Sequence, residues 1–88
     1  MGGYPYLIKM RYELELIRIY HPKDEPDYET RRTERTISTG DNYQELRTIL
    51  DNYKLRKGKT YSEDIALLEL DEYGDIIDYL YIRSSLEE

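Results

Sequence analysis

The chain has 88 residues, enough for one domain with a modest hydrophobic core and too few for two independent units. It contains no cysteine, which excludes disulfide frameworks, thiolate metal sites and cysteine nucleophiles. No apolar run approaches the roughly 20 residues of a transmembrane helix, and the N-terminal residues lack the layout of a signal peptide. We therefore expect a cytoplasmic protein that contacts no membrane.

Charge and aromatic content are both unusual. The formal net charge is −6, but from Tyr61 onward nine acidic residues accompany a single basic residue, Arg83. That part of the chain carries −8, and residues 1–60 carry +2. There are 11 tyrosines and neither phenylalanine nor tryptophan, so Leu, Ile and Tyr must build the core. Such charge asymmetry bears on association with partners rather than on the fold.

A long strand is predicted over residues 4–20. The even positions from 4 to 16 are apolar and the odd positions from 9 to 15 are charged, which is the alternation of a strand with one buried face. Beyond Leu16 the phase changes, because Ile17 and Ile19 are apolar while Arg18 is charged. Either a β-bulge shifts the faces at this point, or the end of the strand is buried on both sides.

A polar second strand is predicted over residues 28–39, after a loop that contains two prolines. It has threonine at four positions and Ile37 as its only aliphatic residue, a composition that favours strand over helix. The two strands would form a hairpin in which Glu13 and Glu15 are available to pair with arginines of the second strand. These arginines are Arg31, Arg32 and Arg35.

A helix is predicted over residues 42–57. Asp41 and Gln44 have the spacing of a capping box at its start. Apolar residues at helical spacing then define one buried stripe. Arg56, Lys57 and Gly58 resemble a helix end, with basic residues in the last turn and a glycine stop.

Two final strands are predicted over 64–72 and 75–83, joined by a tight turn at Tyr73-Gly74. Folding this hairpin places Leu68, Leu70, Ile77 and Tyr79 on one face, and it pairs Leu67 with Leu80 and Ile65 with Ile82 on the other. Which of the two faces the helix covers stays open, and the partner hypothesis below places it over the first. The element order predicts an α+β fold: a two-layer ββαββ domain over 1–88, with one helix on one face of a four-stranded, mainly antiparallel sheet.

Three motifs suggest chemistry, and each has a simpler structural explanation. Gly58-Lys59-Thr60 has Tyr53 where a phosphate-binding loop requires its first glycine, and it follows a helix instead of preceding one. His21, the sole histidine, lies in a polar loop without the spacing of a calcium-binding loop. Glu69 and Asp78 face each other on the predicted hairpin, where an acidic surface is expected. We assign no catalytic residue, cofactor or metal ligand, and expect no enzyme activity.

The second strand offers a candidate nucleic-acid surface. Arg31, Arg32 and Arg35 suit phosphate contacts, and Tyr28 suits base stacking. The chain as a whole is acidic, however, and its long-range field opposes a polyanion. Nucleic acid is therefore not an expected partner, and a single-stranded nucleic-acid binder stands as the second alternative.

The other face of the last hairpin is the predicted partner-binding surface. One helix cannot cover both faces, so the aliphatic residues opposite the helix should meet water or a partner. An aliphatic centre with an acidic rim is typical of an interface. The predicted residues are Ile65, Leu67, Glu69, Asp71, Asp78, Leu80 and Ile82. The structural alternative is that the long first hairpin curls over this face.

The preferred hypothesis is a small acidic protein–protein interaction module that inhibits or regulates a host protein. Acidic residues two apart on a strand repeat at about 6.8 Å, which is similar to the spacing of phosphates along a nucleic-acid strand. Such a surface could occupy the basic groove of a nucleic-acid-handling or defence protein. In composition alone, the chain resembles inhibitors that phages make against host nucleases and defence systems. The alternative is a homodimeric structural or accessory protein that self-associates through the C-terminal hairpin.

Overall fold

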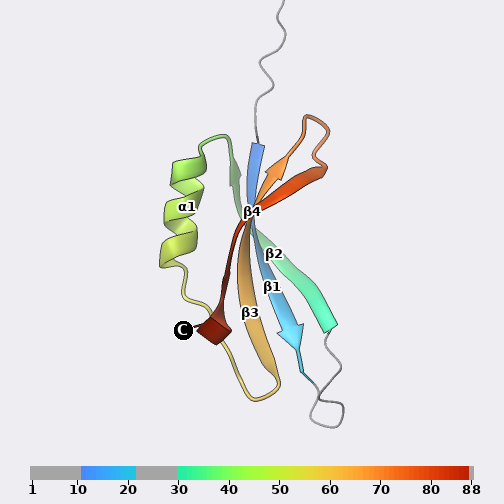
Figure 1. Ribbon diagram of the computed structural model, residues 1–88, viewed down its shortest axis with the longest axis vertical. Helices are drawn as coiled ribbons and strands as arrows, with labels where there is room; N and C mark the ends of the chain where they lie inside the picture. Colours follow the sequence, from blue (N-terminus) through green and yellow to red (C-terminus); the bar gives the residue numbers. More distant parts are fainter. Residues whose placement is uncertain (1–10, 22–29, 88) are drawn as a thin grey trace, which may run out of the picture.

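Four antiparallel strands form a single sheet in the order β2-β1-β3-β4, and a helix packs on one face (Figure 1). The computed structural model describes residues 11–21 and 30–87. Residues 4–10 of the first predicted strand, the predicted loop from residue 22 and the first two residues of the second predicted strand lie outside the described residues. The predicted α+β fold is confirmed. The elements are β1 (Arg11–Tyr20), β2 (Thr30–Gly40), α1 (Tyr43–Asn52), β3 (Tyr61–Leu70), β4 (Ile76–Ser84) and the short 3₁₀ helix η1 (Ser85–Glu87).

The change of phase in β1 comes from burial on both faces. Pairing with β3 runs without interruption from Arg11 to Tyr20, so β1 itself has no bulge toward β3. The register with β2 does shift at two points, and the extra residues there are Glu34 and Ile37 of β2. Leu16 and Ile19, on opposite faces of β1, are both buried. The second alternative, burial of the strand end on both sides, is therefore correct for β1, and the bulges lie in β2.

Helix α1 begins close to the predicted position and ends earlier. Asn42, one residue after the expected Asp41, is the N-cap, and its side-chain oxygen accepts from the Glu45 amide at 3.2 Å. The helix ends at Asn52, five residues before the predicted end, and its last turn contains no basic residue. The Arg83 guanidinium of β4 instead donates to the Leu50 and Tyr53 carbonyl oxygens. A cation that is distant in sequence thus hydrogen-bonds to the carbonyl oxygens at the C-terminus of the helix and interacts favourably with the helix dipole.

Gly58 has a role other than the predicted helix stop. Its amide donates to the Tyr61 carbonyl at 2.9 Å, and Lys57 bridges to Ser62, so the segment makes a tight turn into β3. A Cβ added at Gly58 would lie 2.4 Å from Cε1 of Tyr61. A side chain at this position would therefore force the Tyr61 ring to move.

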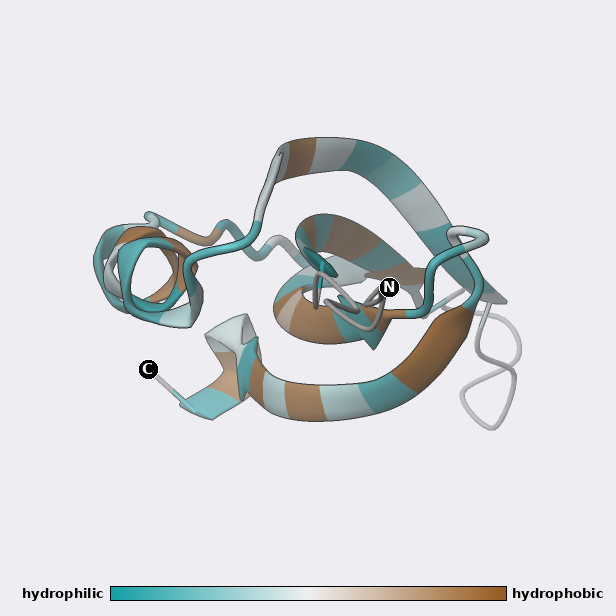
Figure 2. Ribbon diagram, turned by 90° about the horizontal axis from the view of Figure 1, so that it is seen from above, coloured by the Kyte–Doolittle hydropathy of each residue, from teal (hydrophilic) through white to brown (hydrophobic). Residues whose placement is uncertain are grey.

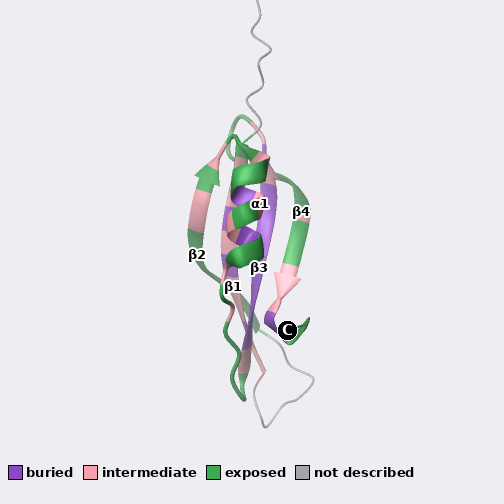
Figure 3. Cartoon of the chain, turned by 90° about the vertical axis from the view of Figure 1, so that its left-hand side faces the viewer, coloured by how far each residue is buried: buried purple, intermediate pink, exposed green. Residues whose placement is uncertain are grey.

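The hydrophobic core lies between α1 and the two central strands. Leu46 and Leu50 of α1 pack against three sheet residues, Leu14, Ile65 and Leu67. Leu14 pairs with Leu67 in the register of β1 with β3, and Leu16 pairs with Ile65, so the apolar face of β1 continues across β3. Figure 3 shows the central strands buried beneath the helix and β4 largely exposed.

A buried carboxylate ties several segments together below this core. Glu63 is 2% exposed and accepts from Arg18 Nη2 at 2.9 Å and from the Arg56 amide at 2.8 Å. Its own amide donates to Ser85 Oγ at 3.0 Å. The hydrogen bond to Glu63 is the largest of the effects that raise the pKa of Arg18. Glu63 thus joins β1, the segment after α1, β3 and η1.

The last hairpin turns at Gly74, which has a φ of 87° and matches the predicted turn. The Asp71 carboxylate accepts from the amides of Tyr73 at 2.8 Å and Asp75 at 2.9 Å, which fixes the turn. Glu69 pairs with Asp78 as predicted. The register of β3 with β4 shifts between Leu67 and Leu68 and again between Glu69 and Leu70. These shifts change the face of the sheet on which the β4 side chains lie.

The pairs predicted beyond these shifts are wrong. Leu67 lies opposite Tyr81 instead of Leu80, and Ile65 lies opposite Arg83 instead of Ile82. The extra residues in β4 are Ile77 and Leu80, and Leu80 is partly buried against the core. Among the described residues, no helix has the length and apolar character needed to cross a membrane.

Candidate functional site

The predicted partner-binding surface does not form as expected. Ile65 and Leu67 are fully buried against α1, and Leu80 packs against the same core. The expected facing of the hairpin is therefore wrong. The physical reason is the pairing of β3 with β1, which extends the leucine face of β1 through Ile65 and Leu67 and places the helix over them.

The remaining predicted residues lie at or near the surface of the hairpin. Ile82 and Asp78 are exposed, and Glu69 and Asp71 are half-buried. Asp78 and Glu69 face each other across the β3–β4 ladder. Asp71 is occupied within the turn, where its carboxylate accepts two amide hydrogen bonds. The predicted acidic residues thus lie close together in the structure, whereas the predicted aliphatic residues are divided between the core and the surface.

Strand β4 instead presents a different apolar surface, which sequence reasoning assigned in part to the helix. Four of its side chains are about half exposed, and we call them the β4 patch: Ile76 (47%), Ile77 (59%), Tyr79 (50%) and Ile82 (51%). Figure 2 shows apolar residues alternating with polar ones along this strand. Since β4 is an edge strand, paired only with β3 among the described strands, both its side chains and its outer backbone edge are available.

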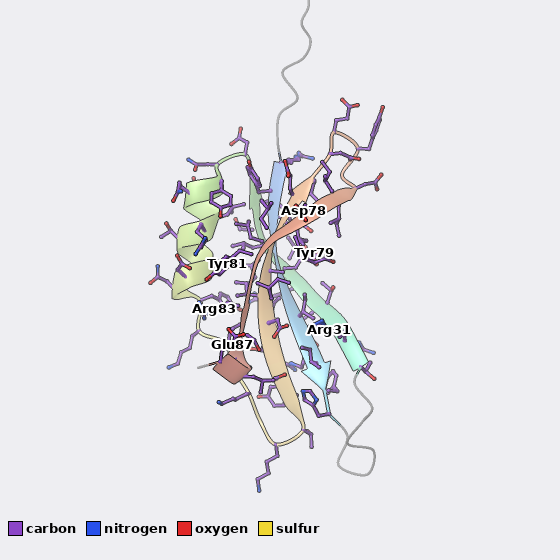
Figure 4. All side chains as sticks on the ribbon, in the orientation of Figure 1. Arg31, Asp78, Tyr79, Tyr81, Arg83 and Glu87 are labelled. Atoms are coloured by element: carbon purple, nitrogen blue, oxygen red, sulfur yellow. The ribbon has the colours of Figure 1, made fainter. Side chains whose placement is uncertain are left out.

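The two tyrosines near the middle of β4 have different roles. Figure 4 shows Tyr81 directed toward α1 and Tyr79 directed toward the other side. The Arg47 guanidinium carbon lies 3.7 Å from the centre of the Tyr81 ring, which holds this ring against the helix. Tyr79 lies opposite Leu68 and lines a cavity on the face away from α1. Tyr79 is therefore part of the candidate site, and Tyr81 belongs to the helix layer.

This cavity has a volume of about 370 Å³ and receives side chains from all four strands. We call it the cleft. It forms because the sheet is strongly curved, so that the edge strands β2 and β4 bend around the central pair (Figure 2). The residues that matter for its chemistry are Glu15, Ile17, Arg31, Asp64, Tyr79 and Ile82. One side is apolar and the other carries charge.

The charged side of the cleft contains an ion pair between a buried carboxylate and a largely exposed arginine. Asp64 is 4% exposed, and its Oδ2 accepts from Arg31 Nη2 at 2.9 Å. Its other oxygen, Oδ1, is buried and has no hydrogen-bond partner among the described residues. Nearby, burial raises the pKa of Glu15, and a hydrogen bond and charge repulsion from Glu13 raise it further. Neither Glu13 nor Glu15 forms an ion pair with the β2 arginines within the described chain, contrary to expectation.

The other motifs have structural roles. Arg31 is engaged by Asp64, and Arg35 donates to the Tyr53 hydroxyl at 2.7 Å, so two of the three β2 arginines are already bound within the chain. His21 hydrogen-bonds with Ser62, with 3.2 Å between Nε2 and Oγ, and is not a free loop tip. Within residues 11–21 and 30–87, no cluster of three metal-ligating side chains is found. The described residues do not include Tyr28, the candidate for base stacking, or the acidic residues of the loop after His21, which are Asp24, Glu25 and Asp27.

Sequence reasoning missed Asp64, Glu15 and Tyr79 as members of one site. The available signal was the run Ser62-Glu63-Asp64 ahead of an apolar strand, which reads as a polar connection when strand pairing is unknown. No protein-family model, curated protein or solved structure matches this chain.

Proposed function

We propose that this chain is a small protein–protein interaction module that inhibits or regulates a basic partner protein. The observation that carries the proposal is the β4 patch: four half-exposed apolar side chains on an edge strand, next to an acidic turn. The acidic residues there are Glu69, Asp71, Glu72, Asp75 and Asp78. An apolar centre with a charged rim is the anatomy of a protein interface.

The edge position supports a specific mode of binding. A partner strand added to β4 would gain main-chain hydrogen bonds along its length, while its side chains would contact the β4 patch. The acidic turn would steer a basic partner toward this edge and speed the encounter. A nucleic-acid-handling or defence protein, which presents a basic groove, fits this charge. The absence of cysteine suits a cytoplasmic setting for the encounter.

The test compares two variants that add the same charge. Ile77→Lys places a cation in the β4 patch, and Gln44→Lys places one on the exposed surface of α1. With each as bait in affinity capture from the source cell, the Gln44→Lys variant should return the wild-type partner and Ile77→Lys should lose it. Binding should also weaken as salt increases. Equal capture by both variants would show that β4 is not the binding edge.

Self-association through β4 is the second candidate, because an exposed apolar edge strand also suits a second copy of itself. Analytical ultracentrifugation separates the two. A dimer that Ile77→Lys dissolves and Gln44→Lys preserves would favour the homodimer, and a monomer at high concentration would exclude it.

A further inference from the structure

A second cavity, of about 220 Å³, lies where the segment after α1 meets strands β1, β2 and β3, and it shares no lining residue with the cleft. We call it the basic pocket. Its charged lining residues are Arg18, Glu34, Arg35, Lys54, Arg56 and Glu63. Four of these are cations and two are carboxylates, so the lining has an excess of two positive charges in a chain whose net charge is −6. This excess favours an anion in the pocket.

Both carboxylates of the pocket lie beside one arginine, Arg18. Glu63 accepts from Arg18 Nη2 at 2.9 Å, and Glu34 Oε1 lies 4.0 Å from Arg18 Nε. The excess charge is therefore carried by the other three cations of the lining, which form no ion pair within the described part of the chain: Arg35, Lys54 and Arg56. All three are exposed, so a ligand can reach them from solvent.

Hydrogen bonds fix the frame on which these cations stand. Arg35 Nη2 donates to the Tyr53 hydroxyl at 2.7 Å, and because this hydroxyl is neutral the guanidinium charge stays uncompensated. The Arg56 amide donates to Glu63 at 2.8 Å, so the main chain of Arg56 is held while its side chain is left for a ligand. The cations of the pocket are thus placed by contacts that do not use up their charge.

The negative regions of the molecule do not cancel this charge. The C-terminus of α1 would repel an anion, but its Leu50 and Tyr53 carbonyl oxygens accept from Arg83. The acidic turn begins at Asp71, eight residues along the chain from Glu63 and beyond the far end of β3 (Figure 1). At about 3.3 Å per residue this separation is roughly 25 Å, and salt screens exposed charges over about 8 Å.

Charge and size restrict the class of anion. A volume of about 220 Å³ is below the range of about 300–1,000 Å³ for ligand sites, so one small anionic group fits and a large cofactor does not. Guanidinium groups bind phosphate oxygens through paired N–H donors. A phosphate monoester carries a charge of about −1.5 to −2 at pH 7, which matches the excess of the lining, whereas a carboxylate or a phosphodiester carries a single negative charge.

We propose that the basic pocket binds a phosphate group in its dianionic form, either as free phosphate or as a terminal monoester, with Arg35, Lys54 and Arg56 as its donors. This site is separate from the β4 patch, and the proposal does not depend on the proposed function.

The direct test titrates three probes into ¹⁵N-labelled protein at constant ionic strength and about pH 7.5, where monoesters are dianions. The probes are inorganic phosphate, Nα-acetyl-O-phosphoserine amide and dimethyl phosphate, a monoanionic diester. At least one of the first two should shift the amide resonances of Arg35, Lys54 and Arg56, and the tighter of them tells whether the phosphate is free or carried by a protein. Dimethyl phosphate should bind at least about fivefold more weakly. Equal binding of the diester, or no shift with either dianion, would overturn the proposal.

Variants assign the binding to the pocket. Lys54→Gln should weaken the tighter dianion by at least about threefold, and the double variant Lys54→Gln/Arg56→Gln by at least about tenfold. Lys59→Gln, the same loss of charge on the same exposed segment but outside the pocket, should change it by less than about twofold. The double variant should keep the wild-type melting temperature, because both side chains are exposed and Arg56 holds Glu63 through its main chain. If Lys59→Gln weakens binding as much as Lys54→Gln, phosphate responds to the general charge of the segment and the pocket is not a site.

Discussion

Truncating Leu67 and Ile82 to alanine tests which face of the C-terminal hairpin packs against the helix. Leu67 is fully buried in the core with Leu14, Leu46 and Leu50, whereas Ile82 is 51% exposed on the other face. The two residues are similar in size, so the difference between the variants reports on burial rather than on chemistry.

The expected magnitudes follow from these burials. Replacing a fully buried leucine by alanine removes apolar contact and leaves a cavity, at a cost of about 2–5 kcal/mol. Ile82 already has half of its surface in water, so Ile82→Ala should cost about 1 kcal/mol or less. A domain of this length has a total unfolding free energy of about 4–13 kcal/mol, so the first loss is a large fraction of it.

Urea unfolding followed by far-UV circular dichroism measures both changes. Leu67→Ala should lower the midpoint strongly at an unchanged slope, and thermal unfolding should shift by about 4–8 °C for each kcal/mol. Tyr73→Ala, at the exposed tip of the turn, serves as the surface control. If Ile82→Ala proves the more destabilising of the two, the hairpin faces the helix the other way and the cleft described above does not exist.

Three further substitutions test local features. Asn42→Ala should lower the unfolding free energy by about 1 kcal/mol in urea unfolding through loss of the N-cap, and Asp41→Ala should change it much less. Glu15→Gln should raise the melting temperature at pH 7, because the raised pKa of Glu15 means that ionisation destabilises the folded state. In calorimetry this gain should disappear below the ordinary carboxyl value of 4.5. Glu63→Ala should destabilise far more than Glu69→Ala in the same assay, since only Glu63 is buried with its hydrogen bonds satisfied.

The elements themselves were predictable because their signals are local. The alternation in β1, the polar β2, the apolar stripe of α1 and the turn at Gly74 all arise from residues close together in sequence. The end of α1 was not predictable in this way. The basic residues before Gly58 resemble a helix stop, but the cation at the helix end is Arg83, which β4 brings from more than 25 residues away.

The facing of the C-terminal hairpin also depends on distant residues. Both faces of β3 are apolar, so its own sequence does not choose between Leu67 and Leu68 as the residue beneath the helix. The choice is made by β1, whose first half has one apolar face, and Leu14 of that face pairs with Leu67. Because the strand order β2-β1-β3-β4 could not be inferred, neither this facing nor the cleft that results from it could be predicted.

The charge asymmetry of the sequence separates into two parts in the folded chain. Glu63 and Asp64, two of the nine acids after Tyr61, are buried and paired with Arg18 and Arg31 from the N-terminal half. These pairs use opposite charges from the two halves to hold β3 to β1 and β2, and each joins a buried carboxylate to an arginine that is itself partly exposed. The acids around the turn of the last hairpin are more exposed, so salt screens them strongly. Glu63 and Asp64 are therefore occupied within the chain, and the acidic residues beside the β4 patch are the ones that can give partner binding its salt dependence.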